Sequence, residues 1–149
     1  MSDTPLRVAR ADELTAAEMH DLLRLRMDVF VVEQACAYPD IDGRDTEPGT
    51  LHLWHTAQGA VVSTLRVLDD GDTWSIGRVA TAPSARGQGL SAELVAEAIA
   101  RCTGRDIVIG AQTYLEGWYA RFGFVRGGED YLDDGVAHLP MRRQAEGPA

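Results

Sequence analysis

The chain of 149 residues is 45% hydrophobic and 25% charged, a balance typical of a single globular domain, which we expect to span residues 1–149. Its 14 basic and 23 acidic residues give a formal net charge of −9, which disfavours a nucleic-acid partner. All of the basic residues are arginine. The sequence therefore excludes chemistry that needs a Schiff-base lysine or the lysine of a P-loop.

Neither a membrane segment nor a metal site is expected. No apolar run approaches the roughly 18 to 20 residues that cross a bilayer. The first residues, MSDTPLRVARADEL, show no signal-peptide pattern, so we expect a cytoplasmic protein without membrane contact. Cys36 and Cys102 do not make a disulfide framework, and neither has neighbours at a metal-ligand spacing.

The first third of the chain predicts a strand, a helix and a long loop. Residues 6–10 (LRVAR) have the composition of a short strand. Thr15 and Glu18 have the spacing of a capping box, and the apolar residues that follow recur at helical spacing. We expect this helix to fray near residues 31–34. The segment 35–50, rich in turn formers and acids, then predicts a loop.

Three strands follow in close succession. Residues 51–57 and 60–68 are apolar-rich and are separated by Gln58-Gly59, which predicts a hairpin. The turn DDGD at residues 69–72 leads into a third strand at residues 73–82. Together they predict an antiparallel meander.

The rest of the chain alternates helices and strands. A helix is expected from Leu90 to about residues 101–104, followed by a strand at residues 106–111 whose continuous apolar run predicts burial on both faces. Residues 113–124 predict a helix stopped by Gly123, and strand-like pieces follow around Phe124-Val125 and in VAHLPMR at residues 136–142. The order β-α-β-β-β-α-β-α-β-β predicts an α/β protein with a mixed sheet flanked by helices.

The segment VATAPSARGQGLS, residues 79–91, has the composition of an anion-binding loop at the start of a helix. Gly87 and Gly89 let backbone N–H groups turn toward an anion, and Arg86 supplies a charge. The dinucleotide fingerprint is excluded because its third glycine is missing, and the P-loop is excluded because it needs lysine. By itself, the pattern also fits an ordinary tight loop.

Two motifs that occur in the order known from one superfamily favour the anion-binding loop over the ordinary tight loop. Val79-Ala80-Thr81 with the loop at residues 86–91 resembles motif A of the GNAT superfamily, the acyl-CoA-dependent N-acyltransferases. Residues 118–124, WYARFGF, resemble that superfamily's FYEKLGF motif, one helix and one strand downstream. Residues 22–45 are similar to the first-helix signature of its ElaA-like branch.

The resemblance implies a mostly antiparallel central sheet, splayed between two strands where acetyl-CoA binds. The asparagine that the superfamily often has seven residues before its motif tyrosine is replaced by Gln112, in a chain that contains no asparagine. By position, the cofactor-binding residues implied by the resemblance are Val79, Ala80, Thr81, Arg86, Gly87, Gln88, Gly89, Leu90, Ser91 and Gln112.

The resemblance also assigns chemistry to Tyr119, which matches the tyrosine that protonates the departing thiolate. The alternative is that Tyr119 is a core aromatic residue. An attacking amine must also lose a proton, and the candidate bases are His52, Glu33 and Asp42. His52 also fits a structural histidine in a strand, and Glu33 could merely cap the end of the helix. Phe30, Glu33 and Asp42 are expected on the acceptor side, whereas His138 is expected at the surface.

The acidic loop offers two further interpretations. Asp40, Asp42 and Asp45 could attract a cationic amine, or they could only make turns and solvate the loop. A calcium loop is disfavoured, because Asp45 stands where the EF-hand pattern has glycine and Leu51 where it has glutamate.

The function implied is transfer of an acetyl group from acetyl-CoA to a primary amine, by direct attack in a ternary complex. The acceptor is a small molecule or a peptide, no metal is implied, and a homodimer is an expectation from the superfamily alone. Two alternatives stay open: a non-catalytic acyl-CoA-binding sensor, and an enzyme similar to the acyl-homoserine-lactone synthases, which the loose match at residues 26–30 suggests.

Overall fold

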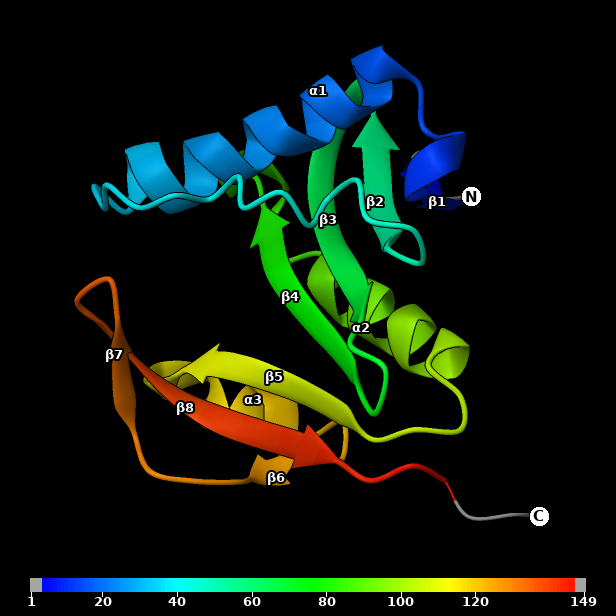
Figure 1. Ribbon diagram of the computed structural model, residues 1–149. Coiled ribbons are helices and arrows are strands. Elements are labelled where there is room, and N and C mark those ends of the chain that lie inside the picture. The colour runs from blue at the N-terminus through cyan, green and yellow to red at the C-terminus, as the bar shows by residue number, and fades with distance from the viewer. Residues whose placement is uncertain (1–3, 147–149) are drawn as a thin grey trace.

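The computed structural model describes residues 4–146, which form one eight-stranded sheet with helices on both faces (Figure 1). The strands are β1 (Leu6–Arg10), β2 (Leu51–Ala57), β3 (Ala60–Asp69), β4 (Trp74–Thr81), β5 (Ile107–Gln112), β6 (Val125–Arg126), β7 (Tyr131–Asp133) and β8 (Val136–Arg143). The α-helices are α1 (Ala16–Arg26), α2 (Leu90–Arg101) and α3 (Glu116–Ala120). Helix α1 continues as a π-helical segment, Met27–Glu33.

The sheet is mixed and mostly antiparallel, as the sequence predicted. Its strands run in the order β1-β2-β3-β4-β5-β8-β6, with β7 paired to β8. Only β4 and β5 are parallel neighbours, and they share just two residue pairs, Trp74 with Ile107 and Ser75 with Val108. Beyond these pairs the strands separate, which divides the sheet into two halves (Figure 1).

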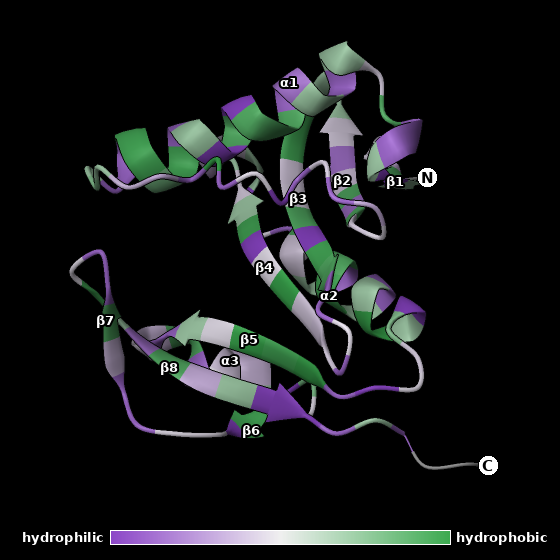
Figure 2. Ribbon diagram, viewed as in Figure 1, coloured by the Kyte–Doolittle hydropathy of each residue, from purple (hydrophilic) through white to green (hydrophobic). Residues whose placement is uncertain are grey.

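Helix α1 covers one face of the sheet, and α2 and α3 cover the other (Figure 1). The main core lies on the α2 side, where Leu94 and Val95 pack with apolar side chains of β2, β3, β4, β5 and β8. A smaller cluster on the α1 side contains Leu25, Val29 and Ala80. Figure 2 shows the hydrophobic residues that alternate with polar ones along β3 and β4.

Two predictions about strands need correction. The segment Tyr131–Asp133 forms β7, which the sequence did not predict because all three residues are exposed. Strand β5 was expected to be buried on both faces. Ile107, Ile109 and Ala111 are buried, but the intervening residues Val108 and Gly110 line a cavity beside the separated strands.

The predicted capping box opens α1. The hydroxyl of Thr15 accepts a hydrogen bond from the backbone N–H of Glu18 at 3.1 Å, and a Glu18 carboxylate oxygen accepts one from the backbone N–H of Thr15 at 2.9 Å. The predicted fraying is wrong, because the chain stays helical through Glu33 by widening into π-helical turns. Such turns are frequent at functional sites.

A buried ion-pair network holds the long loop at residues 34–50 against the sheet. Arg26 of α1 donates hydrogen bonds to the carboxylates of Asp40 and Asp45. Arg66 of β3 donates to Asp42 at 2.6 Å and to Asp45 at 3.1 Å. Arginines of the same chain thus already neutralise these aspartates, which favours a structural function for them over attraction of an amine.

The same network supports a bulge in β4. Between the pairs Arg66–Gly77 and Thr64–Ala80, β4 has one residue more than β3, and Arg78 adopts a left-handed conformation with φ +53°. The Arg78 guanidinium lies over the Tyr38 ring, and its Nε is 3.0 Å from a carboxylate oxygen of Asp40. These contacts stabilise a backbone conformation that a non-glycine residue rarely adopts.

Replacing Asp45 by Asn should destabilise the fold, because Arg26 and Arg66 would lose the carboxylate that they share while remaining buried. We expect the free energy of unfolding in urea to fall by about 3 kcal/mol or more. Asp12→Asn is the matched control, because Asp12 pairs with Arg10 at the exposed surface. A loss for Asp45→Asn no larger than that for Asp12→Asn would contradict the network's contribution to stability.

Acid should weaken the same network. Hydrogen bonds from Arg66 hold the pKa of Asp42 well below its ordinary value of 3.8. Burial raises the pKa of Asp45, but contacts with Arg26 and Arg66 outweigh it and the net shift is downward. Carboxylates with a lowered pKa stabilise the fold fully above pH 3.8, and this stabilisation is lost as the pH falls below that value. Urea unfolding across this range should show a shallower acid loss for Asp45→Asn than for the wild type.

Candidate active site

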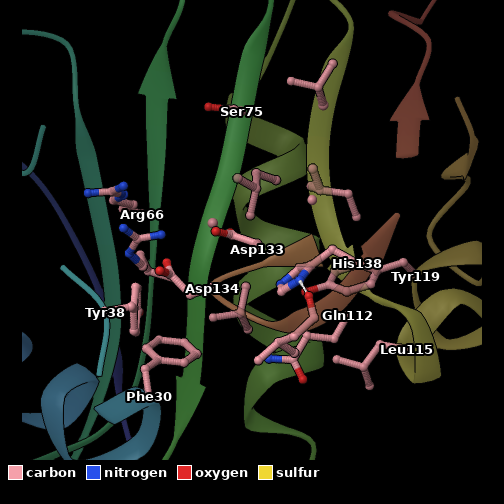
Figure 3. A pocket seen from close by; sticks show the side chains of 18 of the residues that line it. Phe30, Tyr38, Arg66, Ser75, Gln112, Leu115, Tyr119, Asp133, Asp134 and His138 are labelled. Atoms are coloured by element: carbon pink, nitrogen blue, oxygen red, sulfur yellow. Dashed lines mark hydrogen bonds between the residues drawn. The ribbon is translucent and has the colours of Figure 1, made fainter. Parts of the chain in front are cut away.

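Two cavities open where β4 and β5 separate. The loop cavity has a volume of about 660 Å³ and lies beside the segment 85–92. The hairpin cavity has a volume of about 340 Å³ and lies beside the hairpin of β7 and β8 (Figure 3). They meet at a junction formed by the residues that line both, which are Phe30, Gln34, Val79, Gln112, Leu115 and Tyr119.

The loop cavity is built as the sequence predicted for an anion site. Gly87 and Gly89 have φ of +82° and +77°, and Gly89 is the N-cap of the 12-residue helix α2. This geometry leaves the N–H groups of the first turn of α2 unpaired within the helix. Of the ten predicted cofactor-binding residues, only the exposed Gln88 does not line this cavity.

The loop cavity fits a diphosphate-bearing ligand such as coenzyme A in chemistry and in shape. A Cβ atom placed on Gly87 or Gly89 would meet no atom within 4 Å, so the space in front of the loop is open. These glycines are therefore needed for their positive φ and not to avoid a steric clash. A helix N-terminus with left-handed glycines is a typical phosphate site. The edge of β4 beyond Ser75 has no β5 partner, which leaves backbone groups available to an extended ligand.

Glu33 and Arg86 close one side of the loop cavity as an ion pair. The Glu33 carboxylate accepts two hydrogen bonds of 2.6 Å from the Arg86 guanidinium, whose Nε also donates to the carbonyl oxygen of Thr81. The hydrogen bonds from Arg86 hold the pKa of Glu33 below its ordinary value. A carboxylate paired in this way is a weak base. The structure therefore favours Glu33 as a residue that positions the Arg86 guanidinium.

Tyr119 lies at the junction and is 7% exposed. Its ring packs edge-on against Trp118 and Phe124, so the alternative prediction of a core aromatic residue also describes its surroundings. Its hydroxyl makes no hydrogen bond with any other residue between 4 and 146. Burial raises the pKa of Tyr119 to about 12. The phenol therefore keeps its hydrogen at neutral pH and faces both cavities as a potential donor.

Two other predicted site residues lie elsewhere. His52 is 1% exposed, its Nε2 is 2.9 Å from the carbonyl oxygen of Asp45, and burial lowers its pKa. It lines neither cavity, so the structural alternative describes it and we do not propose it as a base. Asp42 belongs to the ion-pair network and lines neither cavity, whereas Phe30 lines both of them.

The hairpin cavity brings predicted site residues together with residues that the sequence analysis did not assign to the site, among them Cys36, Tyr38, Arg66 and His138. Phe30, Tyr38 and Arg66 line one wall and His138, Tyr119 and Gln112 the opposite wall (Figure 3). Cys36 joins the walls, because its thiol donates to the carbonyl oxygen of Asp134 at 3.6 Å. His138 was expected at the surface. The only signal against that expectation was the position of His138 inside an apolar strand, VAHLPMR. That pattern does not reveal that β7 pairs with this strand beside His138.

Neither a metal cluster nor a membrane span is found within the described part of the chain. No three or more of its His, Cys, Asp and Glu side chains gather as potential ligands of one metal ion. No helix in residues 4–146 combines the length and apolar character needed to cross a bilayer.

Comparison with known proteins places this site in a family. A family model described as an acetyltransferase (GNAT) domain matches residues 18–145. A UPF0039 protein of Mycobacterium bovis is 46% identical over 147 residues, covering 95% of this chain and 94% of that one. The protein ElaA of Escherichia coli is 35% identical over 139 residues, covering 89% of this chain and 91% of that one.

Solved structures agree with the sequence relatives. A crystal structure of an acyl-CoA N-acyltransferase from Pseudomonas aeruginosa is 37% identical and has a TM-score of 0.90, covering 94% of this chain and 99% of that one. The crystal structure of Escherichia coli ElaA has a TM-score of 0.89 at 33% identity, covering 95% and 99% of the two chains. The mixed sheet, the loop cavity and these similarities together show that the chain belongs to the GNAT acetyltransferase family, with ElaA among its relatives.

Proposed function

We propose that this protein transfers an acyl group, acetyl in the simplest case, from coenzyme A to a primary amine by direct attack in a ternary complex. The observation that carries the proposal is that two cavities of different chemistry meet at one buried residue, Tyr119, whose hydroxyl has no hydrogen-bond partner within residues 4–146. A reaction between two bound molecules needs this arrangement, because the reacting atoms must come together within about 3–3.5 Å.

The loop cavity is the proposed donor side. Backbone N–H groups of the loop and the first turn of α2 would hold the diphosphate, and Arg86 would add a charge-assisted contact. The unpaired edge of β4 at Val79, Ala80 and Thr81 would hold the extended arm of the cofactor by backbone hydrogen bonds. When bound, the cofactor supplies a thioester, whose carbonyl carbon is the electrophile.

The hairpin cavity is the proposed acceptor side. It lies across the junction from the loop cavity, and its volume of about 340 Å³ suits a small molecule or the end of a peptide. Tyr119 and Gln112 line both cavities, so a nitrogen atom brought to the junction from the hairpin side would face the thioester.

Tyr119 is the proposed general acid. Its raised pKa keeps the phenol protonated, and the hydroxyl has no competing acceptor among the described residues. The leaving thiolate is a stronger base than a neutral thioester sulfur, so it takes the phenolic hydrogen only as the carbon–sulfur bond breaks.

Replacing Tyr119 by Phe should lower kcat by about 100-fold or more, because proton donation of this kind contributes about 10²–10⁴-fold. The aromatic packing stays, so acetyl-CoA affinity measured by calorimetry should change little. Thiol release would be measured with a simple alkylamine, a diamine, an amino acid and a short peptide. Unchanged kcat in the variant would refute the acid function. Acetyl-CoA binding without transfer by the wild type to any of these amines would favour a sensor over an enzyme.

Replacing Gly89 by Ala should weaken acetyl-CoA binding about tenfold. A side chain disfavours the φ of +77° by about 1–2 kcal/mol, so the free loop would leave the conformation that points its N–H groups into the cavity. Gly104→Ala is the matched control, because Gly104 has φ +79° and lies outside both cavities. Equal affinities of the two variants in calorimetry would refute the loop as the diphosphate site.

A further inference from the structure

The hairpin cavity contains a histidine whose surroundings fix the position of its proton. His138 of β8 pairs directly with Gln112 of β5 on one side and with Tyr131 of β7 on the other. Residues opposite one another in antiparallel strands project from the same face of the sheet. These three side chains therefore form a row that runs from the junction of the cavities into the hairpin cavity.

The hydrogen bond of the His138 ring identifies its tautomer. Nδ1 lies 2.8 Å from the carbonyl oxygen of Val136 (Figure 3). A carbonyl oxygen can only accept, so Nδ1 carries the hydrogen and Nε2 of the neutral ring keeps its lone pair. Nε2 has no hydrogen-bond partner among residues 4–146. A histidine held in this way can take a proton from a molecule in the cavity.

The ring is also held in place by its neighbour. The Tyr131 ring stacks on His138 with ring centroids 5.7 Å apart and an interplanar angle of 23°. The Tyr131 hydroxyl lies over Gly110 of β5, where the Cβ atom of any other residue would collide with it. The stack and the hydrogen bond to Val136 together orient the imidazole, as a catalytic base requires.

The charges around His138 favour a cationic acceptor. Asp133 and Asp134, at the tip of the hairpin, line the same cavity and form no side-chain ion pair with any described residue. Across the cavity, the charges of Arg66 and Arg78 are offset by the aspartates of the ion-pair network, and Tyr38 donates its hydroxyl to Asp40. The uncompensated charge near His138 is therefore negative, which attracts an ammonium group.

We propose that His138 is the general base of the transfer, an assignment that rests on the proposed function. Nε2 removes one proton from the ammonium group of the acceptor. The freed lone pair forms a bond to the thioester carbonyl carbon, the carbon–sulfur bond breaks, and the thiolate takes the hydrogen of Tyr119. The second nitrogen proton restores the Tyr119 hydroxyl, and His138 releases its proton to water. The products are an amide, a thiol and one free proton.

His138→Asn tests the assignment, because the Asn amide can still donate to the Val136 carbonyl oxygen but cannot accept a proton. With the panel amine that turns over fastest, we expect kcat to fall about 10²–10⁴-fold, with acetyl-CoA affinity unchanged. The fall of kcat toward acidic pH in the wild type should be absent in the variant. Added imidazole should restore part of the activity of His138→Ala. His20→Asn is the control, since His20 is exposed on α1 and lines neither cavity.

Three results would overturn the assignment. One is a His138→Asn kcat within about threefold of wild type. A second is an acid limb of the pH profile that persists in the variant. The third result needs no acceptor. It is a nitrogen-15 NMR spectrum in which the neutral His138 ring carries its hydrogen on Nε2. Failure of the proposed function would be seen before any variant is made, as a wild type that binds acetyl-CoA but transfers to no amine. In that case the assignment of His138 as the base would also be wrong.

Discussion

The pairing between β4 and β5 stops after two residue pairs, and the geometry of both cavities depends on that short contact. A continuous pairing would bury the facing edges of both strands and close the space between them. A complete separation would divide the core, because Leu94 and Val95 of α2 pack with residues from both halves of the sheet. The observed compromise keeps the hydrophobic core intact on the α2 side while leaving strand edges free for a ligand.

The ion-pair network stabilises this arrangement from the opposite face. Three arginines, Arg26, Arg66 and Arg78, are matched by Asp40, Asp42 and Asp45, so the charges of the network are neutral as a set. Arg78 is also the left-handed residue of the β4 bulge. A bulge bends its strand and increases the local twist. Contacts that hold Arg78 in this conformation therefore also hold β4 away from the line of β5.

Tyr119 combines core packing with the chemistry that we propose for it. Its ring belongs to the core between Trp118 and Phe124, which limits its motion and keeps water away from it. The same burial raises its pKa, so the packing that stabilises the fold also keeps the hydroxyl protonated. The two predictions made for this tyrosine are thus compatible descriptions of one position.

Local patterns in the sequence determined most of the secondary structure. The capping box at Thr15, the hairpin at Gln58-Gly59, the meander and the loop before α2 all depend on contacts within a few residues, which spacing and turn chemistry encode. The family resemblance in the loop and in residues 118–124 also came from contiguous residues, and comparison with known proteins confirmed it.

Only the tertiary structure decided which distant side chains meet. Asp42 and Arg66 are 24 residues apart, and no local pattern distinguishes an aspartate that pairs with arginine from one that attracts a substrate. Strand β7 and the orientation of His138 depend on pairing with β8 and on a stacked tyrosine. The continuous apolar run of β5 was consistent with full burial, and its cavity-lining face became visible only with the separation from β4. Sequence spacing encodes local conformation, whereas burial and charge partners are set by elements that fold together from far along the chain.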